Sequence, residues 1–309
     1  MCPWMIWGSK IEALQFRNQF RMLPESLARS SLDFQGMKLP GTVHTAESIN
    51  YAWKELKVFD DDVFNVTYPK SGTTWIQEIL SLIYSNGDPT PVKTEFSWDR
   101  VPWIEQHAHK AKIESLTSPR LLTTHLPLKF FPQNFHKSKA KVIYTIRNPK
   151  DVCVSLYYFC KIAQFMEFRE DFQEFVARFL SKDEVYSGWF EHVKGWLTLK
   201  GQPNILFLSY EAMLKNPREN IVNICKFLGK DLDDAAIDSV VTNSSFKAMK
   251  ENGKSNYSAV PKFIFNQDEV SFYRKGIAGD HKNHFTPALD EEFDKTYHEL
   301  MKDVDLTFT

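Results

Sequence analysis

The chain has 309 residues, of which 43% are hydrophobic and 25% charged, a balance that excludes both a disordered polypeptide and a membrane-embedded bundle. Its 38 basic and 39 acidic residues leave a formal net charge of −1. This balance excludes a uniformly basic nucleic-acid scaffold, although a local basic cluster stays compatible with it.

Strand-like and helix-like patterns alternate along the first half of the chain. Residues 63–68 predict a buried strand, and residues 73–84, whose apolar side chains recur at helical spacing, predict the helix that follows. Residues 120–124 predict a short second strand, and residues 140–146 give the clearest prediction of a buried strand.

The alternation continues to the carboxyl side. Asn148 and Pro149 predict a helix start, because asparagine caps helix N-termini and proline fits the first helical position. Residues 204–210 predict a fourth strand, and the next helix is expected to end at Gly229. Residues 244–285 are poorer in periodicity and are expected to form a long excursion over the sheet edge.

Strands separated by helices predict an α/β fold with a central, mostly parallel sheet flanked by helices. We expect a single domain over residues 1–309, with residues 1–30 as an N-terminal extension. The apolar first residues lack the basic segment of a signal peptide, no apolar run reaches 18 residues, and four cysteines do not indicate a disulfide framework. A cytoplasmic protein without a membrane span is therefore expected.

Unusual polar residues follow the predicted strands at their carboxyl ends. Lys70 follows the first strand, His125 the second and Arg147 the third, and Tyr210 ends the fourth. Because ligands of open α/β sheets bind beyond the carboxyl ends of the strands, we expect these four residues to converge on one site.

Residues 70–75 have the properties of an anion-binding loop. Gly72 permits a tight turn, the following helix presents unpaired N–H groups, and Lys70, Thr73 and Thr74 add a charge and two hydroxyls. The lysine precedes the glycine, so the GxxxxGK[ST] pattern of nucleotide triphosphatases is absent. An ordinary strand–turn–helix with a Ser/Thr cap is the alternative.

A second phosphate group is expected near the third strand. Arg147 and Ser155 are placed to hold it, since a guanidinium matches phosphate geometry, and Arg274, Lys275 and Gly276 form a further basic loop. The alternatives are a surface ion pair for the arginine of the strand end and a solvated loop for the basic doublet.

His125 is the candidate proton acceptor. Imidazole is suited to proton transfer near pH 7, and the histidine is expected beside both anion sites. A lone histidine is more often structural, but no Ser-His-Asp order, paired carboxylates or metal-ligand cluster competes for the assignment. We expect no metal site.

Three blocks of the sequence resemble the cytosolic sulfotransferases, which move a sulfuryl group from 3′-phosphoadenosine 5′-phosphosulfate to an acceptor hydroxyl. The blocks are residues 68–75, 147–155 and 274–285, and the similarity extends from about residue 34 to residue 293. In this order the three blocks are highly specific for the family.

The resemblance implies a reaction and its site. His125 matches the catalytic base, and Lys70 matches the residue that stabilises charge on the leaving nucleotide, 3′-phosphoadenosine 5′-phosphate. The residues that match the binding site of this cosubstrate are Lys70, Ser71, Gly72, Thr73, Thr74, Trp75, Arg147, Ser155, Tyr210, Ser244, Phe246, Met249, Arg274, Lys275 and Gly276.

The resemblance also implies a pocket for a small hydrophobic acceptor. Thr123 and residues 244–252 and 255–258 are similar to the hydroxysteroid/alcohol branch, so an aliphatic or steroidal alcohol is the expected acceptor, and a phenol is the alternative. The residues that match the pocket, each of which is also compatible with a plain core aromatic, are Trp98, Trp103, Phe159, Phe165 and Tyr257.

Two positions depart from the family pattern. Family members often form homodimers through a segment that corresponds to residues 282–291, and here Pro287 stands in place of valine. Proline removes a backbone donor and fixes φ, which weighs against dimerisation by this route. His281 replaces the usual tryptophan, and the sequence assigns it no role.

Two further interpretations stay open. A P-loop kinase or nucleotidase is disfavoured by the misplaced lysine and by Arg147, which stands where a magnesium-binding aspartate is needed. A protein that binds the nucleotide or a sterol without turnover is disfavoured by the presence of both His125 and Lys70. No nucleic-acid partner is expected.

Overall fold

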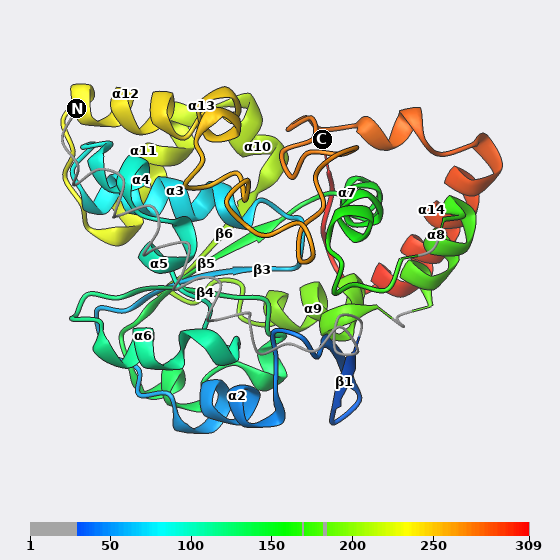
Figure 1. Cartoon of the computed structure of the whole chain (residues 1–309), viewed down its shortest axis with the longest axis horizontal. Helices are drawn as coiled ribbons and strands as arrows, with labels where there is room; N and C mark the ends of the chain where they lie inside the picture. The colour runs from blue at the N-terminus through cyan, green and yellow to red at the C-terminus, as the bar shows by residue number, and fades with distance from the viewer. Residues whose placement is uncertain (1–29, 169, 182–183, 309) are drawn as a thin grey trace.

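The computed structural model describes residues 30–168, 170–181 and 184–308 (Figure 1). All but the last residue of the predicted N-terminal extension therefore lies outside the described residues. The described chain begins with an antiparallel hairpin that the sequence pattern did not predict, formed by β1 (Ser31–Phe34) and β2 (Met37–Pro40). Gln35 and Gly36 at its tip both have positive φ, as a tight two-residue turn requires.

The central sheet has four strands, and every pairing between them is parallel. The order across the sheet is β4 (Leu121–Thr124), β3 (Val63–Thr67), β5 (Lys141–Ile146) and β6 (Ile205–Ser209). The predicted α/β fold with a parallel sheet is confirmed, and the predicted strands agree with the observed ones to within about one residue at each end.

The predicted helices are confirmed at the positions that carried cap signals. The Asn148 side chain accepts a hydrogen bond from the Lys150 N–H at the start of α7, and Gly229 has φ +73° after the end of α11.

Among the described residues, no helix combines the length and apolarity that a membrane crossing requires. The helices of this part of the chain are α2 (Ala46–Asn50), the π-helix η2 (Tyr51–Glu55), α3 (Thr73–Tyr84), α4 (Thr90–Thr94), α5 (Ser97–Arg100), α6 (Lys110–Ser115), α7 (Pro149–Ile162), α8 (Phe172–Leu180), α9 (Gly188–Leu197), α10 (Tyr210–Lys215), α11 (Pro217–Leu228), α12 (Asp234–Asn243), α13 (Phe246–Glu251) and α14 (Pro287–Met301), with short 3₁₀ turns at η3 (His107–His109), η4 (Leu128–Phe130), η5 (Gln133–Lys137), η6 (Val185–Ser187) and η7 (Asp280–Asn283).

Helices cover both faces of the sheet, as Figure 1 shows. Val63, Ile143 and Leu208 belong to a core cluster with the buried residues of α3, α11 and α12. Phe64 and Tyr144, from the opposite face of the sheet, belong to a second cluster with α7, α8, α9 and α14. Both faces of the strands are therefore buried, which explains why their sequences are almost continuously hydrophobic.

The strand order places a reversal beside β3. The chain passes from β3 to β4 on one side and then to β5 on the other, so the carboxyl end of β3 lies at a topological switch point. The end of β6 is one of the boundaries that differ by one residue from the prediction: Ser209 caps α10, and Tyr210 begins this helix instead of ending β6.

The long segment 244–285 is more ordered than its sequence suggested. It contains α13 and η7, and it contacts the end of α7 through an isolated bridge between Ala163 and Phe265. The segment contributes many residues to the cavity at the carboxyl ends of the strands, in keeping with the expected excursion over the sheet edge.

Candidate active site

A cavity of about 300 Å³ lies where the carboxyl ends of the four strands meet. Ser71, whose side chain is buried, is the one predicted site residue that does not line this cavity. The predicted site residues that line the cavity are Lys70, Gly72, Thr73, Thr74, Trp75, Trp98, Trp103, His125, Arg147, Ser155, Phe159, Phe165, Tyr210, Ser244, Phe246, Met249, Tyr257, Arg274, Lys275 and Gly276.

The loop between β3 and α3 has the backbone conformation of an anion cradle. Lys70 and Gly72 both have positive φ, at +70° and +103°, and α3 begins immediately afterwards. A Cβ atom on residue 72 would lie 2.9 Å from the Tyr210 ring, so a side chain has no room there. The loop therefore presents the unpaired N–H groups of α3 toward the cavity.

Lys70 is the central cation of this cradle. Its Nζ lies 4.4 Å from the ring centres of both Phe159 and Phe272, which hold the ammonium over aromatic faces. Burial lowers the pKa of Lys70 to about 7, and the positive charges of Arg147 and Arg274 contribute to this lowering. A bound anion would offset both the burial of the ammonium group and its repulsion by the two arginines, so this position favours a negatively charged ligand.

His125 is held in one orientation at the end of β4. Its Nδ1 lies 2.6 Å from the Thr67 carbonyl oxygen, its backbone N–H donates to Glu105 Oε1 at 2.8 Å, and its ring lies 4.5 Å from the Trp103 ring. Burial lowers the pKa of His125 to about 3, so the imidazole is neutral. With Nδ1 donating to Thr67, the lone pair of Nε2 is the basic site.

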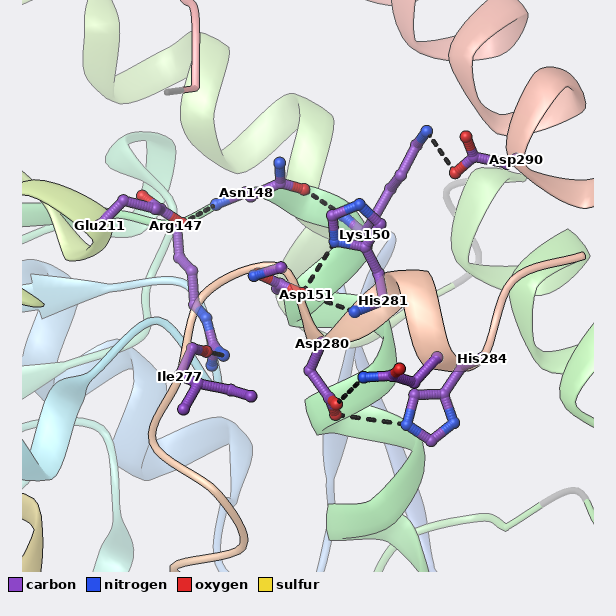
Figure 2. A network of polar contacts seen from close by, with 12 residues as sticks. Arg147, Asn148, Lys150, Asp151, Glu211, Ile277, Asp280, His281, His284 and Asp290 are labelled. Carbon is purple, nitrogen blue, oxygen red and sulfur yellow. Dashed lines mark hydrogen bonds and ion pairs between the residues drawn. The ribbon is translucent and has the colours of Figure 1, made fainter. Parts of the chain in front are cut away.

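Arg147 links two loops of the site. Its Nη1 donates to the Lys70 carbonyl at 2.9 Å. Its Nη2 donates to the Ile277 carbonyl at 3.2 Å, and Figure 2 shows these two residues side by side. The guanidinium carbon also lies 4.3 Å from the centre of the Tyr210 ring, and that ring contacts Trp75 edge to face. The two basic regions predicted separately from the sequence are therefore joined through one side chain.

The basic doublet is paired with an acid that the sequence patterns did not reveal. Asp280 accepts from Arg274 Nη2 and from Lys275 Nζ, each at 2.6 Å. Burial raises the pKa of Asp280, but hydrogen bonds from Lys275, Asn283 and Arg274 outweigh burial and hold the pKa well below its usual range. Asp280 falls within the block 274–285 that carries the family resemblance, but the sequence pattern assigned it no role, because an acid after a glycine in a loop is common.

Aromatic residues form the other end of the cavity. Trp98 and Tyr257 have ring centres 5.1 Å apart, and Phe159 and Phe165 have theirs 6.3 Å apart. Of the five predicted pocket residues, Trp98 and Trp103 belong to the main core cluster and the other three pack against it, so these aromatics line the cavity and are also part of the core packing. Thr123 does not reach the cavity, since its buried hydroxyl donates to Val101 and accepts from Gln77.

Several residues that line the cavity were not predicted. Tyr186 contacts the His125 ring at 5.2 Å and has φ +57°, a conformation that the sequence does not indicate. Tertiary structure brings these residues to the cavity from segments without a motif. The additional lining residues include Val43, His44, His107, His109, Met166, Tyr186, Ile264, Phe265 and Phe272.

Comparisons of this chain with family models, with known protein sequences and with solved structures all indicate the same family over most of its length. Residues 60–305 match the sequence model of the family described as "Sulfotransferase domain". The 3-beta-hydroxysteroid sulfotransferase of Cavia porcellus is 46% identical over 89% of this chain and 96% of its own length, and Sulfotransferase 2B1 of Rattus norvegicus is 41% identical over 97% and 86%. The crystal structure of mouse sulfotransferase SULT7A1 complexed with PAP aligns with a TM-score of 0.75 and 29% identity, over 89% of this chain and 95% of that one.

Proposed function

This chain belongs to the sulfotransferase family, and we propose that its cavity brings 3′-phosphoadenosine 5′-phosphosulfate together with the hydroxyl of a hydroxysteroid or a similar hydrophobic alcohol. The observation that carries the proposal is the position of Lys70 and His125 in one cavity, both adjacent to the carboxyl end of β3. Sulfuryl transfer to an alcohol needs a positively charged site that binds the anionic donor and, beside it, a neutral base that accepts the hydroxyl proton.

The residues present fit the cosubstrate. Arg147 lines the cavity, and its buried Nε has no hydrogen-bond partner among the described residues, so it has capacity for a phosphate or sulfate oxygen. We assign the 5′-phosphosulfate to the loop 70–75, and the adenine to the region of Trp75, Tyr210 and Phe246. We assign the 3′-phosphate to the basic group formed by Arg147, Ser155, Arg274, Lys275 and Gly276.

The mechanism assigns one task to each of the two central residues. Nε2 of His125 takes the proton of the acceptor hydroxyl as the oxygen attacks sulfur, and the Thr67 carbonyl keeps the imidazole in the required tautomer. Lys70 stabilises the negative charge that develops on the leaving oxygen of the nucleotide. The cosubstrate supplies the activated sulfuryl group.

The acceptor class rests on the relatives and on the aromatic end of the cavity. The Cavia porcellus relative is named for a 3-beta-hydroxysteroid, and it is 46% identical to this chain. Flat aromatic walls, such as those of Trp98 and Tyr257, suit a fused-ring alcohol. A phenol-type acceptor is the alternative, and the acceptor assay distinguishes the two.

The decisive experiment is a transfer assay. The full-length protein is incubated with 3′-phosphoadenosine 5′-phosphosulfate and a mixture of hydroxysteroids, aliphatic alcohols and phenols, and the products are identified by mass spectrometry. Sulfated hydroxysteroids are the expected products. Tight nucleotide binding with no sulfated product from any acceptor would instead favour a non-catalytic binding protein.

A further inference from the structure

Asp151, in the first turn of α7, makes a cluster of contacts that the proposed mechanism does not use (Figure 2). Its Oδ2 accepts from the Gly279 N–H at 2.6 Å, and its Oδ1 accepts from both the backbone N–H and the ring Nδ1 of His281, each at 2.9 Å. The side chains of Asp151 and His281 are 1% and 12% exposed, and neither residue lines the cavity.

These contacts fix the loop that carries the second cationic group. Gly279 and His281 flank Asp280, whose carboxylate holds Arg274 and Lys275. The carboxylate of Asp151, on α7, thus binds the backbone of the loop. The carboxylate of Asp280, in the loop itself, holds the side chains of Arg274 and Lys275. The positions of Arg274 and Lys275 therefore depend on where Asp151 holds residues 279–281.

Residues 147–151, at the start of α7, contact the loop at a second point. Arg147, just before α7, donates to the carbonyl of Ile277, and Asp151 accepts from the N–H of Gly279. The loop is therefore held on both sides of residue 278: it accepts a hydrogen bond at Ile277 and donates one at Gly279. Because Arg147 also donates to the Lys70 carbonyl, the start of α7 sets the loop relative to the cradle formed by residues 70–75.

The charge state of Asp151 supports a strong interaction. Burial raises the pKa of its carboxyl, but hydrogen bonds from His281 and Gly279 outweigh burial and hold the pKa below its usual range. The carboxylate is therefore ionised at neutral pH. Hydrogen bonds to an ionised group are stronger than those between neutral partners, and their loss is correspondingly more costly.

We propose that Asp151 and His281 form a clasp that positions the loop 274–281 for the 3′-phosphate of the nucleotide. The clasp rests on the proposed function, since it presupposes that Arg274 and Lys275 receive this phosphate. Asp151 and His281 are positioning residues: they act through the two cations and do not touch the ligand. Their contribution should therefore be specific to nucleotides that carry a 3′-phosphate.

The test compares two nucleotides by isothermal titration calorimetry. In the wild-type protein, Kd is measured for 3′-phosphoadenosine 5′-phosphate and for adenosine 5′-phosphate, which lacks the 3′-phosphate. His281→Leu removes the side-chain donor and should raise Kd for the first nucleotide about tenfold or more, with little change for the second. His281→Asn, whose amide N–H can reach the same carboxylate oxygen, should restore most of the affinity.

Two further variants complete the design. Asp151→Asn keeps the shape and removes the charge, and it should also lose about tenfold in affinity for the 3′-phosphorylated nucleotide, which tests the clasp even if His281→Leu does not fold. The matched control is His298→Asn, because His298 is exposed on α14 and its ring bonds to the carbonyl of Asp294 in its own helix. Its affinities should equal those of the wild type.

The outcomes separate the clasp from the proposed function. Unchanged affinity in folded His281→Leu and Asp151→Asn would overturn the clasp, as would an equal loss for both nucleotides, which would mark a general structural role. A wild-type protein that does not bind 3′-phosphoadenosine 5′-phosphate at all would instead contradict the proposed function.

Discussion

The Nδ1 nitrogen of His125 lies 2.6 Å from the carbonyl oxygen of Thr67, the last residue of β3. A carbonyl oxygen only accepts hydrogen bonds, so Nδ1 must carry the proton and Nε2 must carry the lone pair. The pairing of β3 with β4 brings the two residues together, since Thr124 lies opposite Val66 in this ladder. The sheet itself thus selects the tautomer of the base.

We predict that His125→Ala lowers kcat by at least about 100-fold, the usual lower contribution of a general base. The affinity for 3′-phosphoadenosine 5′-phosphate should change little, because the cations of the site are untouched. Steady-state assays with a hydroxysteroid and calorimetric titration check the two halves of this prediction. His136→Ala, which removes an exposed histidine, is the control. Turnover near the wild-type rate in His125→Ala would remove His125 from the mechanism.

The pKa of Lys70, lowered to about 7 by burial and by neighbouring positive charges, predicts a pH dependence of nucleotide binding. A lysine with this pKa is charged below pH 7 and neutral above it in the free protein. Since the charged form binds the anion, Kd should be constant at lower pH and should rise as pH increases above about 7. His125, with a pKa of about 3, stays neutral over the same range and adds no dependence.

Titrations of 3′-phosphoadenosine 5′-phosphate between about pH 6 and pH 9 measure this effect. Lys70→Met serves as the control, because the ionisation of the ligand itself affects both proteins alike. The variant should bind more weakly and should lose the rise in Kd above pH 7. The same slope in both proteins would show that Lys70 does not titrate in this range.

Much of the fold could be predicted because its signals are local. The strand at 63–67 and the helix at 73–84 follow from hydrophobic pattern, and the helix ends at Asn148 and Gly229 follow from cap chemistry. The rule that ligands bind beyond the carboxyl ends of parallel strands then suffices to predict that Lys70, His125 and Arg147 share one site.

Other features depend on contacts between distant parts of the chain. Asp151 and His281 are 130 residues apart, and neither belongs to a local pattern that indicates the other. The sequence also gives no indication of the positive φ of Tyr186 or of the hairpin β1–β2, whose strands have four residues each. Short strands and single strained residues contribute too little periodicity to be recognised.

The acceptor assignment gives a prediction about selectivity. A 3β-hydroxysteroid should have a kcat/KM at least about tenfold higher than a simple phenol, since burial of the larger apolar surface against Trp98 and Tyr257 stabilises its transition state. Parallel assays at saturating cosubstrate measure the ratio. A preference for the phenol would contradict the hydroxysteroid assignment and leave the donor site unaffected.

Pro287 gives a prediction about assembly. It is the first residue of α14, where a missing N–H costs no helical hydrogen bond, and it is exposed together with Lys282 and Thr286. Proline has no backbone N–H to donate in the segment 282–291, for which the sequence resemblance implied a dimer contact. We predict that Pro287→Val increases self-association in sedimentation velocity at micromolar concentration. A wild-type protein that is already dimeric there would show that the proline is no obstacle.

Gly276 offers a steric test of the nucleotide site. Its φ is +65°, and a Cβ atom at this position would lie 2.1 Å from Cδ2 of Phe246, whose ring must then move. Overpacking of this kind destabilises a folded protein by about 1–3 kcal/mol, which corresponds to roughly a fivefold to 150-fold change in the folding equilibrium constant. Because Phe246 is assigned to the adenine, Gly276→Ala should raise Kd for both 3′-phosphoadenosine 5′-phosphate and adenosine 5′-phosphate.

The loss in Gly276→Ala has two physical sources, and Gly201 separates them. Gly201 has φ +94°, and a Cβ atom added there would meet no described atom within 4 Å, so Gly201→Ala imposes the left-handed strain, about 1–2 kcal/mol, without a steric clash. Both variants should lose thermal stability, Gly276→Ala the more because it adds the clash with Phe246 to the backbone strain, but only Gly276→Ala should lose nucleotide affinity. If calorimetry gave equal affinities for the two variants, Phe246 would not form part of the nucleotide site, because its displacement would then have no effect on the ligand.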